Sequence, residues 1–167
     1  MKSCGCGTPA RERIAVSPEE AAGLCAGSSW GGGFSPEEWQ AIAWRMHLER
    51  VPSGGTVFRQ GDAEAYLAIL ARGAVEVVGE AALGQPRVLA ILDAGAVFGE
   101  LSLVDGEPRQ ATVRAVEDAT LLVLPAEGFE RLVREQTGLG VKLYAHVARL
   151  IAARLRQADG LLVEYLG

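Results

Sequence analysis

The stretch GGTVFRQGDAEAYLAILARGAVEVV, residues 54–78, decides the fold class. It consists of short apolar runs separated by glycines. Glycine adopts backbone conformations that other residues avoid, so glycines between β-rich runs predict turns between short strands. The glycines that we place at turns are Gly54 or Gly55, Gly61, Gly73 and Gly95.

The same pattern continues downstream, where short β-rich segments are bounded by Gly, Pro or acidic residues. This arrangement is typical of an all-β sandwich or barrel. The apolar positions of the predicted strands are Val75, Val77, Val88, Ala90, Leu92, Val113, Leu121 and Val123. A chain of 167 residues, 49% of them hydrophobic, is long enough for one core but short for two. We expect one domain with appendages.

Two helices are predicted before the strands, each beginning with Ser-Pro-Glu-Glu, at residues 17–20 and 35–38. Ser at the N-cap, Pro at the first helical position and Glu at the third form the capping-box arrangement. The apolar face predicted for the second helix consists of Trp39, Ile42, Ala43 and Met46, with His47 as its last candidate. The glycines at 31–33 predict a flexible hinge rather than a phosphate loop, because no Lys-Ser/Thr follows them.

Two further helices are predicted after the strands. Pro125 opens a short one that ends near Glu135, and a second runs from about Gly138 to Asp159 or beyond. The apolar stripe of the second consists of Leu143, Val147, Leu150, Ile151, Leu155 and Leu162. Such a stripe usually covers the core. Because the helix is longer than one small β-domain can bury, we expect part of the stripe to pair with a second copy in a two-fold dimer.

The segment FGELSLVDGEPRQATV, residues 98–113, carries the chemistry. Gly99 allows a ligand to approach the backbone, and a short helix beginning at Glu100 would offer free N–H groups to an anion. The guanidinium of Arg109 can donate two parallel hydrogen bonds to a phosphate. A carboxylate beside that phosphate needs hydroxyl donors, and a ribose 2′-OH supplies one. On their own, Glu100 and Arg109 also fit an exposed ion pair worth roughly 0–1 kcal/mol.

The whole segment resembles the phosphate-binding cassette of the cyclic nucleotide-binding domain family, in which Gly, Glu, a small residue, Pro and Arg recur at these spacings. Many members end the cassette with PR-x-ATV, which residues 108–113 match. The resemblance extends from about Phe34 to about Leu166. It implies a mainly β fold with α-helices, an antiparallel β-roll (a double-stranded β-helix or jelly roll) flanked by an N-terminal helix and two C-terminal helices.

The resemblance also implies the domain boundaries. Residues 34–167 form the cyclic nucleotide-binding domain, with the β-roll at about 50–124 and the C-terminal helices at about 126–166. Residues 1–33 lie outside it and are expected to be a flexible Cys- and Gly-rich extension with a short helix. The implied ligand-binding residues are Phe98, Gly99, Glu100, Leu101, Ser102, Pro108, Arg109, Gln110, Ala111 and Arg154.

Two features of the sequence leave the identity of the bound base open. One alignment with the bacterial catabolite-activator branch places Arg154 at the level of the purine, and another places Ala158 and Asp159 there; we prefer Arg154. Next to the cassette arginine, cAMP-preferring members of the kinase branch carry Ala and cGMP-preferring members often carry Thr, whereas this chain has Gln110. We favour cAMP, with cGMP or a cyclic dinucleotide as alternatives.

The composition of the chain limits which classes of partner and which compartment are expected. A net charge of −5 without a basic stripe argues against a nucleic-acid partner. The N-terminus has no apolar signal core and no run reaches the length of a membrane span, so we expect a soluble, cytoplasmic protein. The odd set Cys4, Cys6 and Cys25 then predicts reduced thiols, and no neighbouring histidine completes a metal site.

Three classes of function compete. The preferred one is a regulatory module, not an enzyme, that binds a cyclic nucleotide, needs no cofactor and acts on a protein partner or through a homodimer. A second is a cupin-like metalloenzyme, disfavoured because His47 and His146, the chain's two histidines, fall in predicted helices. The third is an adaptor or dimerisation domain that has lost its ligand. Gly99, Glu100 and Arg109 argue against it.

Overall fold

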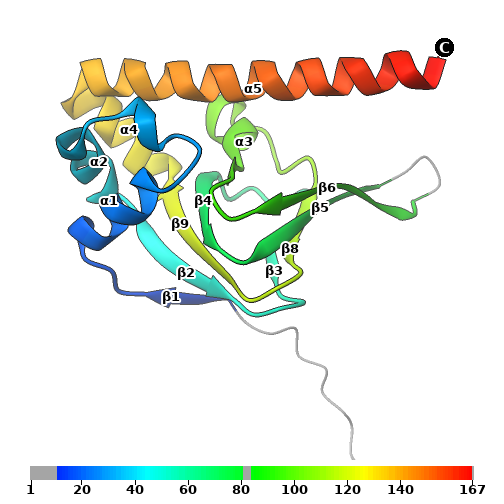
Figure 1. Cartoon of the computed structure of the whole chain (residues 1–167), viewed down its shortest axis with the longest axis horizontal. Helices are drawn as coiled ribbons and strands as arrows, with labels where there is room; N and C mark the ends of the chain where they lie inside the picture. Colours follow the sequence, from blue (N-terminus) through cyan, green and yellow to red (C-terminus); the bar gives the residue numbers. More distant parts are fainter. Residues whose placement is uncertain (1–10, 81–83, 167) are drawn as a thin grey trace, which may run out of the picture.

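Two antiparallel sheets form a β-roll with helices packed against one side of it (Figure 1). The computed structural model describes residues 11–80 and 84–166. The first sheet has the strand order β1-β2-β9-β4-β7 and the second the order β3-β8-β5-β6. The strands are β1 (Glu12–Ile14), β2 (His47–Val51), β3 (Thr56–Phe58), β4 (Tyr66–Arg72), β5 (Ala74–Glu80), β6 (Pro86–Asp93), β7 (Val97–Phe98), β8 (Thr112–Ala115) and β9 (Ala119–Pro125).

The helices lie mainly at the two ends of the chain. They are α1 (Pro18–Ala26), the 3-10 turn η1 (Gly31–Gly33), α2 (Pro36–Ala43), α3 (Glu100–Asp105), α4 (Ala126–Glu135) and α5 (Thr137–Leu166). The predicted fold class is confirmed, as are the predicted strands. Gly54, Gly61, Gly73 and Gly95 all have positive φ at turns.

The central strands β4 and β9 separate two cores. Along β4, Leu67 and Ile69 face the helices, while Ala68 and Leu70 face the second sheet. Side chains alternate across a strand, so a strand covered on both faces is a continuous apolar run. This is the run that the sequence shows at residues 66–70. One core lies between the helices and the first sheet. The other core lies between the two sheets and fills the roll.

The N-terminal boundary differs from the prediction. Residues 12–14 form β1, which pairs with β2, and α1 contributes the fully buried Ala21 and Cys25 to the helical core. The glycines at 31–33 form a 3-10 turn instead of a flexible hinge, and the N–H of Gly33 donates to the carbonyl oxygen of Trp30. Glycine is needed at position 31, because a Cβ there would lie 1.8 Å from the carbonyl oxygen of Ala26. Residues 11–33 are therefore part of the folded unit. Cys4 and Cys6 lie outside the described residues.

Both predicted helix starts are confirmed, but the second helix is shorter than expected. The Ser17 hydroxyl accepts from the Glu20 N–H, and Ser35 and Glu38 form the full reciprocal capping box. The helix α2 ends at Ala43, so the predicted helical face is wrong for Met46 and His47. His47 instead begins β2 and lies opposite Val123 of β9. Pairing with β9 overrides the helical spacing.

The long C-terminal helix α5 runs along the long axis of the molecule, and its C-terminal half continues well beyond α3 (Figure 1). Leu143 and Val147 of its predicted stripe are buried, whereas Leu155 and Leu162 are 61% and 59% exposed. The first half of the stripe therefore covers the core and the second half does not. Within the described ranges, none of the helices combines the length and hydropathy needed to cross a bilayer.

Candidate functional site

The cassette begins where β7 ends, at Gly99. This residue has a φ of +82° and caps α3, so it occupies the left-handed region that favours glycine. A Cβ at this position would lie 2.7 Å from the carbonyl oxygen of Tyr66 and 3.0 Å from Nη1 of Arg109. Glycine is therefore required both by the backbone conformation and by the close approach of the cassette arginine.

Arg109 lies inside the roll, with 3% of its surface exposed. Its guanidinium donates to the carbonyl oxygens of Gly99 at 2.8 Å and Tyr66 at 3.1 Å. It also lies 4.1 Å from the ring centroid of Phe58 and 4.3 Å from that of Tyr66, within the range of cation–π attraction. The backbone N–H of Arg109 donates to the carbonyl oxygen of Asp62, which fixes the cassette arm to the turn between β3 and β4.

No carboxylate of the described residues lies within ion-pair distance of this buried cation. Nε of Arg109 is buried and has no hydrogen-bond partner among them. Burial lowers the pKa of Arg109, although nearby acidic groups oppose the shift. A guanidinium still keeps its charge at neutral pH. Because an unpaired buried charge is costly, the arrangement favours an incoming anion.

Glu100 is fully buried at the start of α3. One carboxylate oxygen, Oε1, accepts a hydrogen bond of 2.5 Å from Nη1 of Arg154. The other, Oε2, is buried and has no partner among the described residues. An exposed ion pair between Glu100 and Arg109 is therefore not what forms here. Glu100 retains one free acceptor, which suits a hydroxyl donor.

Arg154 brings α5 to the cassette. Besides Glu100, its guanidinium donates to the carbonyl oxygen of Val97 on β7 at 2.8 Å. Its side chain is 38% exposed, so it reaches the buried carboxylate from the surface. The structure thus places Arg154 beside the candidate ribose carboxylate, while its contact with a purine stays a prediction. The alternatives Ala158 and Asp159 are exposed further along α5.

The other predicted residues divide into buried and rim positions. Phe98 and Ser102 are buried, Leu101 and Ala111 are half-buried, and Pro108 and Gln110 are exposed. Sequence reasoning missed Phe58 and Tyr66, whose rings hold the guanidinium of Arg109. Both lie in apolar strands, where an aromatic residue is expected to pack in the core. Nothing in the sequence therefore indicated that these two rings contact the cassette arginine.

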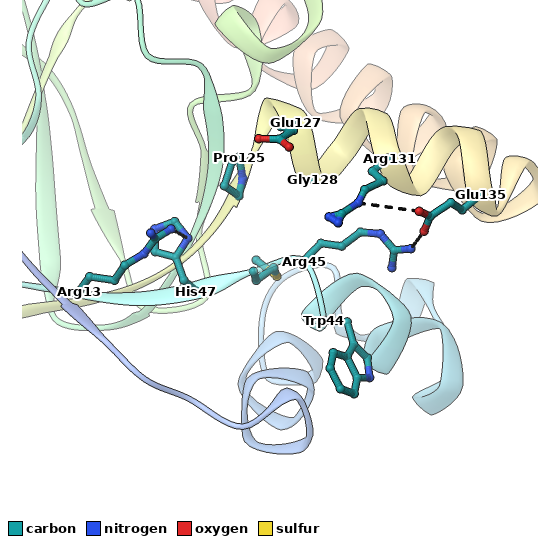
Figure 2. A pocket seen from close by; sticks show the side chains of 10 residues that line it. Arg13, Trp44, Arg45, His47, Pro125, Glu127, Gly128, Arg131 and Glu135 are labelled. Carbon is teal, nitrogen blue, oxygen red and sulfur yellow. Dashed lines mark hydrogen bonds and ion pairs between the residues drawn. The ribbon is translucent and has the colours of Figure 1, made fainter.

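A cavity of about 510 Å³ lies apart from the cassette, between α4 and the segment that joins α2 to β2 (Figure 2). Its walls include Trp44, Arg45, Arg131 and Glu135. Arg45 pairs with Glu135, and Arg131 lies 3.8 Å from the same carboxylate. Both arginines therefore share one carboxylate, whereas the cassette arginine has no carboxylate partner among the described residues. No cluster of three or more potential metal ligands exists in the part of the chain that the structure describes.

Several known proteins are similar to this chain over most of its length. Residues 48–136 match the family model of the cyclic nucleotide-binding domain. The cyclic AMP receptor protein of Thermus thermophilus is 39% identical over 128 residues, which cover 76% of this chain and 57% of that protein. The chain thus spans little more than half the length of this curated relative.

Two solved structures are similar throughout most of the chain. A cyclic nucleotide-binding domain from Methylobacillus flagellatus superposes with a TM-score of 0.82 at 26% identity, covering 93% of this chain and 90% of that one. The catabolite activator protein of Thermus thermophilus gives a TM-score of 0.69 at 35% identity, covering 87% and 62%. Since the family model matches more than half of the chain and a relative is 39% identical over 76% of it, the chain belongs to the cyclic nucleotide-binding domain family.

Proposed function

We propose that the chain is a regulatory module that binds a cyclic nucleotide, cAMP in the first place, through the cassette at residues 98–113. The observation that carries this proposal is the unpaired, buried guanidinium of Arg109. A cyclic phosphodiester would supply the missing negative charge, with charge-assisted hydrogen bonds stronger than those to the carbonyl oxygens of Gly99 and Tyr66. A domain that had lost its ligand would keep a buried charge with no carboxylate partner among the described residues.

The ribose is proposed to lie at the start of α3. The free Oε2 of Glu100 can accept a hydrogen bond from the 2′-OH. Ser102 is buried close by in the same helix, and Ala111 follows the arginine on the other side. Gln110 is exposed, so its amide is free to turn toward either adenine or guanine. We therefore keep cGMP as the alternative ligand and include it in the test.

The output of the module is proposed to pass through α5. Arg154 connects this helix to Glu100, so a ribose that engages Glu100 changes the surroundings of Arg154. A ligand shifts a conformational equilibrium only by its differential affinity for the two states. Leu155 and Leu162 are exposed on α5, and we propose that they pack against α5 of a second copy of the chain. We place this module in the cytoplasm, in accord with the free thiol of Cys25.

Isothermal titration of the protein with cAMP and with cGMP tests the proposal. We expect saturable binding of cAMP that is weakened at least about 100-fold in Arg109→Ala, as expected for the loss of a bidentate charge-assisted contact. Arg114→Ala is the matched control, since Arg114 lies on β8 and pairs with Glu76 on the surface. Absence of heat with both nucleotides would favour the adaptor function instead. Equal affinity in Arg109→Ala would show that the nucleotide binds at another site, so the assignment of the cassette would be wrong.

A further inference from the structure

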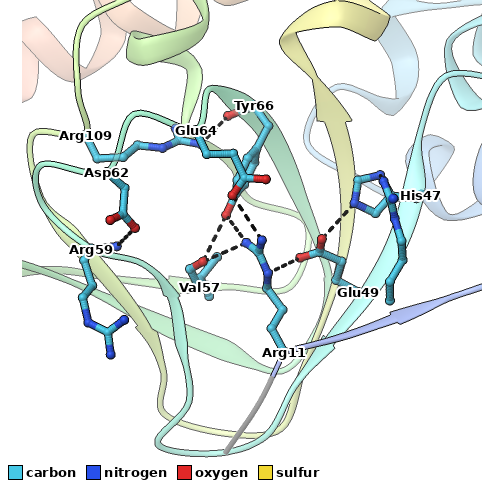
Figure 3. A network of polar contacts seen from close by, with 10 residues as sticks. Arg11, His47, Glu49, Val57, Arg59, Asp62, Glu64, Tyr66 and Arg109 are labelled. Atoms are coloured by element: carbon cyan, nitrogen blue, oxygen red, sulfur yellow. Dashed lines mark hydrogen bonds and ion pairs between the residues drawn. The ribbon is translucent and has the colours of Figure 1, made fainter. Parts of the chain in front are cut away.

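Arg11 lies just before β1, outside the residues that match the family model. Strand β1 pairs with β2 at the edge of the first sheet, Glu12 facing Arg50 and Ile14 facing Leu48. This pairing directs the side chain of Arg11 into the end of the roll, next to Tyr66 (Figure 3).

The guanidinium of Arg11 has four partners. Nη1 donates to the Tyr66 hydroxyl at 2.8 Å and to the carbonyl oxygen of Val57 at 3.0 Å. Nη2 donates to Glu64 at 3.1 Å, and Nε forms an ion pair with Glu49 at the same distance. Burial would lower the pKa of Arg11, but the acidic groups around it raise the pKa overall. These contacts come from three nitrogens of one planar guanidinium, and the single ammonium group of a lysine could not make all of them.

Tyr66 connects Arg11 to the cassette arginine. Its side chain is almost fully buried, and its hydroxyl also donates to the carbonyl oxygen of Val57. Arg109 lies 4.3 Å from the centroid of the same ring and donates to the backbone carbonyl of the same residue. Arg11 therefore holds the phenol end of a residue whose ring and carbonyl hold Arg109 (Figure 3).

Arg11 also balances negative charge next to the cassette. It forms ion pairs with Glu64, which is exposed, and with Glu49, which is buried, and so offsets part of their negative charge. Glu64 and Asp62 interact electrostatically with Arg109 as well. Without Arg11, these carboxylates would compete for Arg109 and repel an incoming anion.

We propose that Arg11 is a positioning residue for the guanidinium of Arg109, acting through Tyr66 and through the charge of Glu64. Strand β1, which holds Arg11 in place, then contributes to the geometry of the ligand site. The consequence for affinity rests on the proposed function, whereas the positioning itself does not.

The positioning is measured first, on the nucleotide-free protein. In a ¹⁵N-labelled sample, the Nε–Hε signal of Arg109 is identified by its loss in Arg109→Lys. This signal senses the ring currents of Phe58 and Tyr66, so we expect it to shift in Arg11→Ala. Arg13→Ala is the matched control, because Arg13 lies on the same strand and contacts His47. An unmoved Arg109 signal in folded Arg11→Ala overturns the proposal, whether or not the protein binds nucleotide.

Titration with cAMP then separates the two claims. We expect Arg11→Ala to weaken binding about tenfold, Arg11→Lys to retain part of the affinity through its charge, and Arg13→Ala to bind like the wild type. If the wild type binds cAMP and Arg11→Ala binds it equally well, the positioning role is wrong. If the wild type binds no nucleotide while the Arg109 signal shifts in Arg11→Ala, the proposed function fails and the positioning stands.

Discussion

Arg154 donates a hydrogen bond of 2.5 Å to Glu100, joining the C-terminal helix α5 to the first residue of α3. The two residues are far apart in sequence, yet the carboxylate is completely buried and the guanidinium reaches it from the surface. In the described residues this is the one ion pair that connects α5 to the cassette. The position of α5 and the state of the candidate ribose carboxylate are therefore physically coupled.

Replacing Arg154 with Ala should destabilise the nucleotide-free protein by about 1–3 kcal/mol, because a buried carboxylate loses its cation. The half-exposed position of Arg154 keeps the effect below that of a fully buried pair. Urea unfolding measures it. The matched control is Arg149→Ala, an exposed arginine of the same helix, which should change the free energy of unfolding by no more than about 0.5 kcal/mol. Equal effects of the two substitutions would show that the pair does not hold α5.

Gly99→Ala should be more harmful than Gly106→Ala. Both glycines have positive φ, +82° and +72°, so each substitution costs about 1–2 kcal/mol of backbone strain. Only at Gly99 would the new Cβ meet the backbone oxygen of Tyr66 at 2.7 Å, whereas Gly106 has free space around it. We expect Gly99→Ala to lower the free energy of unfolding further and to weaken cAMP binding at least about tenfold. Denaturation and titration of both variants check this, and identical behaviour would argue against the close packing.

Association through α5 predicts that the double variant Leu155→Asp, Leu162→Asp is monomeric. Both side chains are exposed in the single chain, and burying a leucine stabilises an interface by about 1.5–3 kcal/mol. Charges at both positions should raise the dimer dissociation constant at least about 100-fold, as measured by sedimentation equilibrium. Gln157→Asp adds a charge at an exposed polar position of the same helix and serves as the control. A wild type that sediments as a monomer at all concentrations would refute this interface.

The buried thiol of Cys25 predicts a loss of stability at alkaline pH. Burial raises its pKa to about 12, whereas an unfolded cysteine titrates near about 8.5. Unfolding therefore releases a proton above about pH 8.5, and the free energy of unfolding falls as the pH rises toward 12. Between pH 8 and 10 the wild type should lose about 2 kcal/mol more than Cys25→Ala. Parallel pH profiles in urea unfolding would contradict the raised pKa.

The parts of the fold that depend on local pattern could be predicted from the sequence. Glycines between apolar runs located the turns at Gly61 and Gly73, and Ser17 and Ser35 located two helix starts. These features depend on neighbouring residues only, through backbone conformation and capping. The cassette was predicted from its resemblance to the family, which can be recognised because its glycine, carboxylate and arginine are close together in sequence.

The parts that depend on distant partners could not be predicted. Strand β1 is only Glu12–Ile14, with no apolar alternation, and it exists because β2 pairs with it. His47 continues the spacing of α2, yet it pairs with Val123 on β9. The role of Tyr66 depends on its backbone carbonyl, which accepts from Arg109, and on its ring, which contacts both Arg11 and Arg109. No sequence pattern marks a residue for such a role.

The central claim is that the buried charge of Arg109 receives a cyclic phosphate. A crystal structure of the protein with cAMP tests this most directly. We predict guanidinium nitrogens of Arg109 within about 3 Å of the phosphate oxygens, and the 2′-OH on the carboxylate of Glu100. A nucleotide bound elsewhere, such as in the cavity beside Arg45 and Arg131, with Arg109 still on the carbonyl of Gly99, would contradict the account.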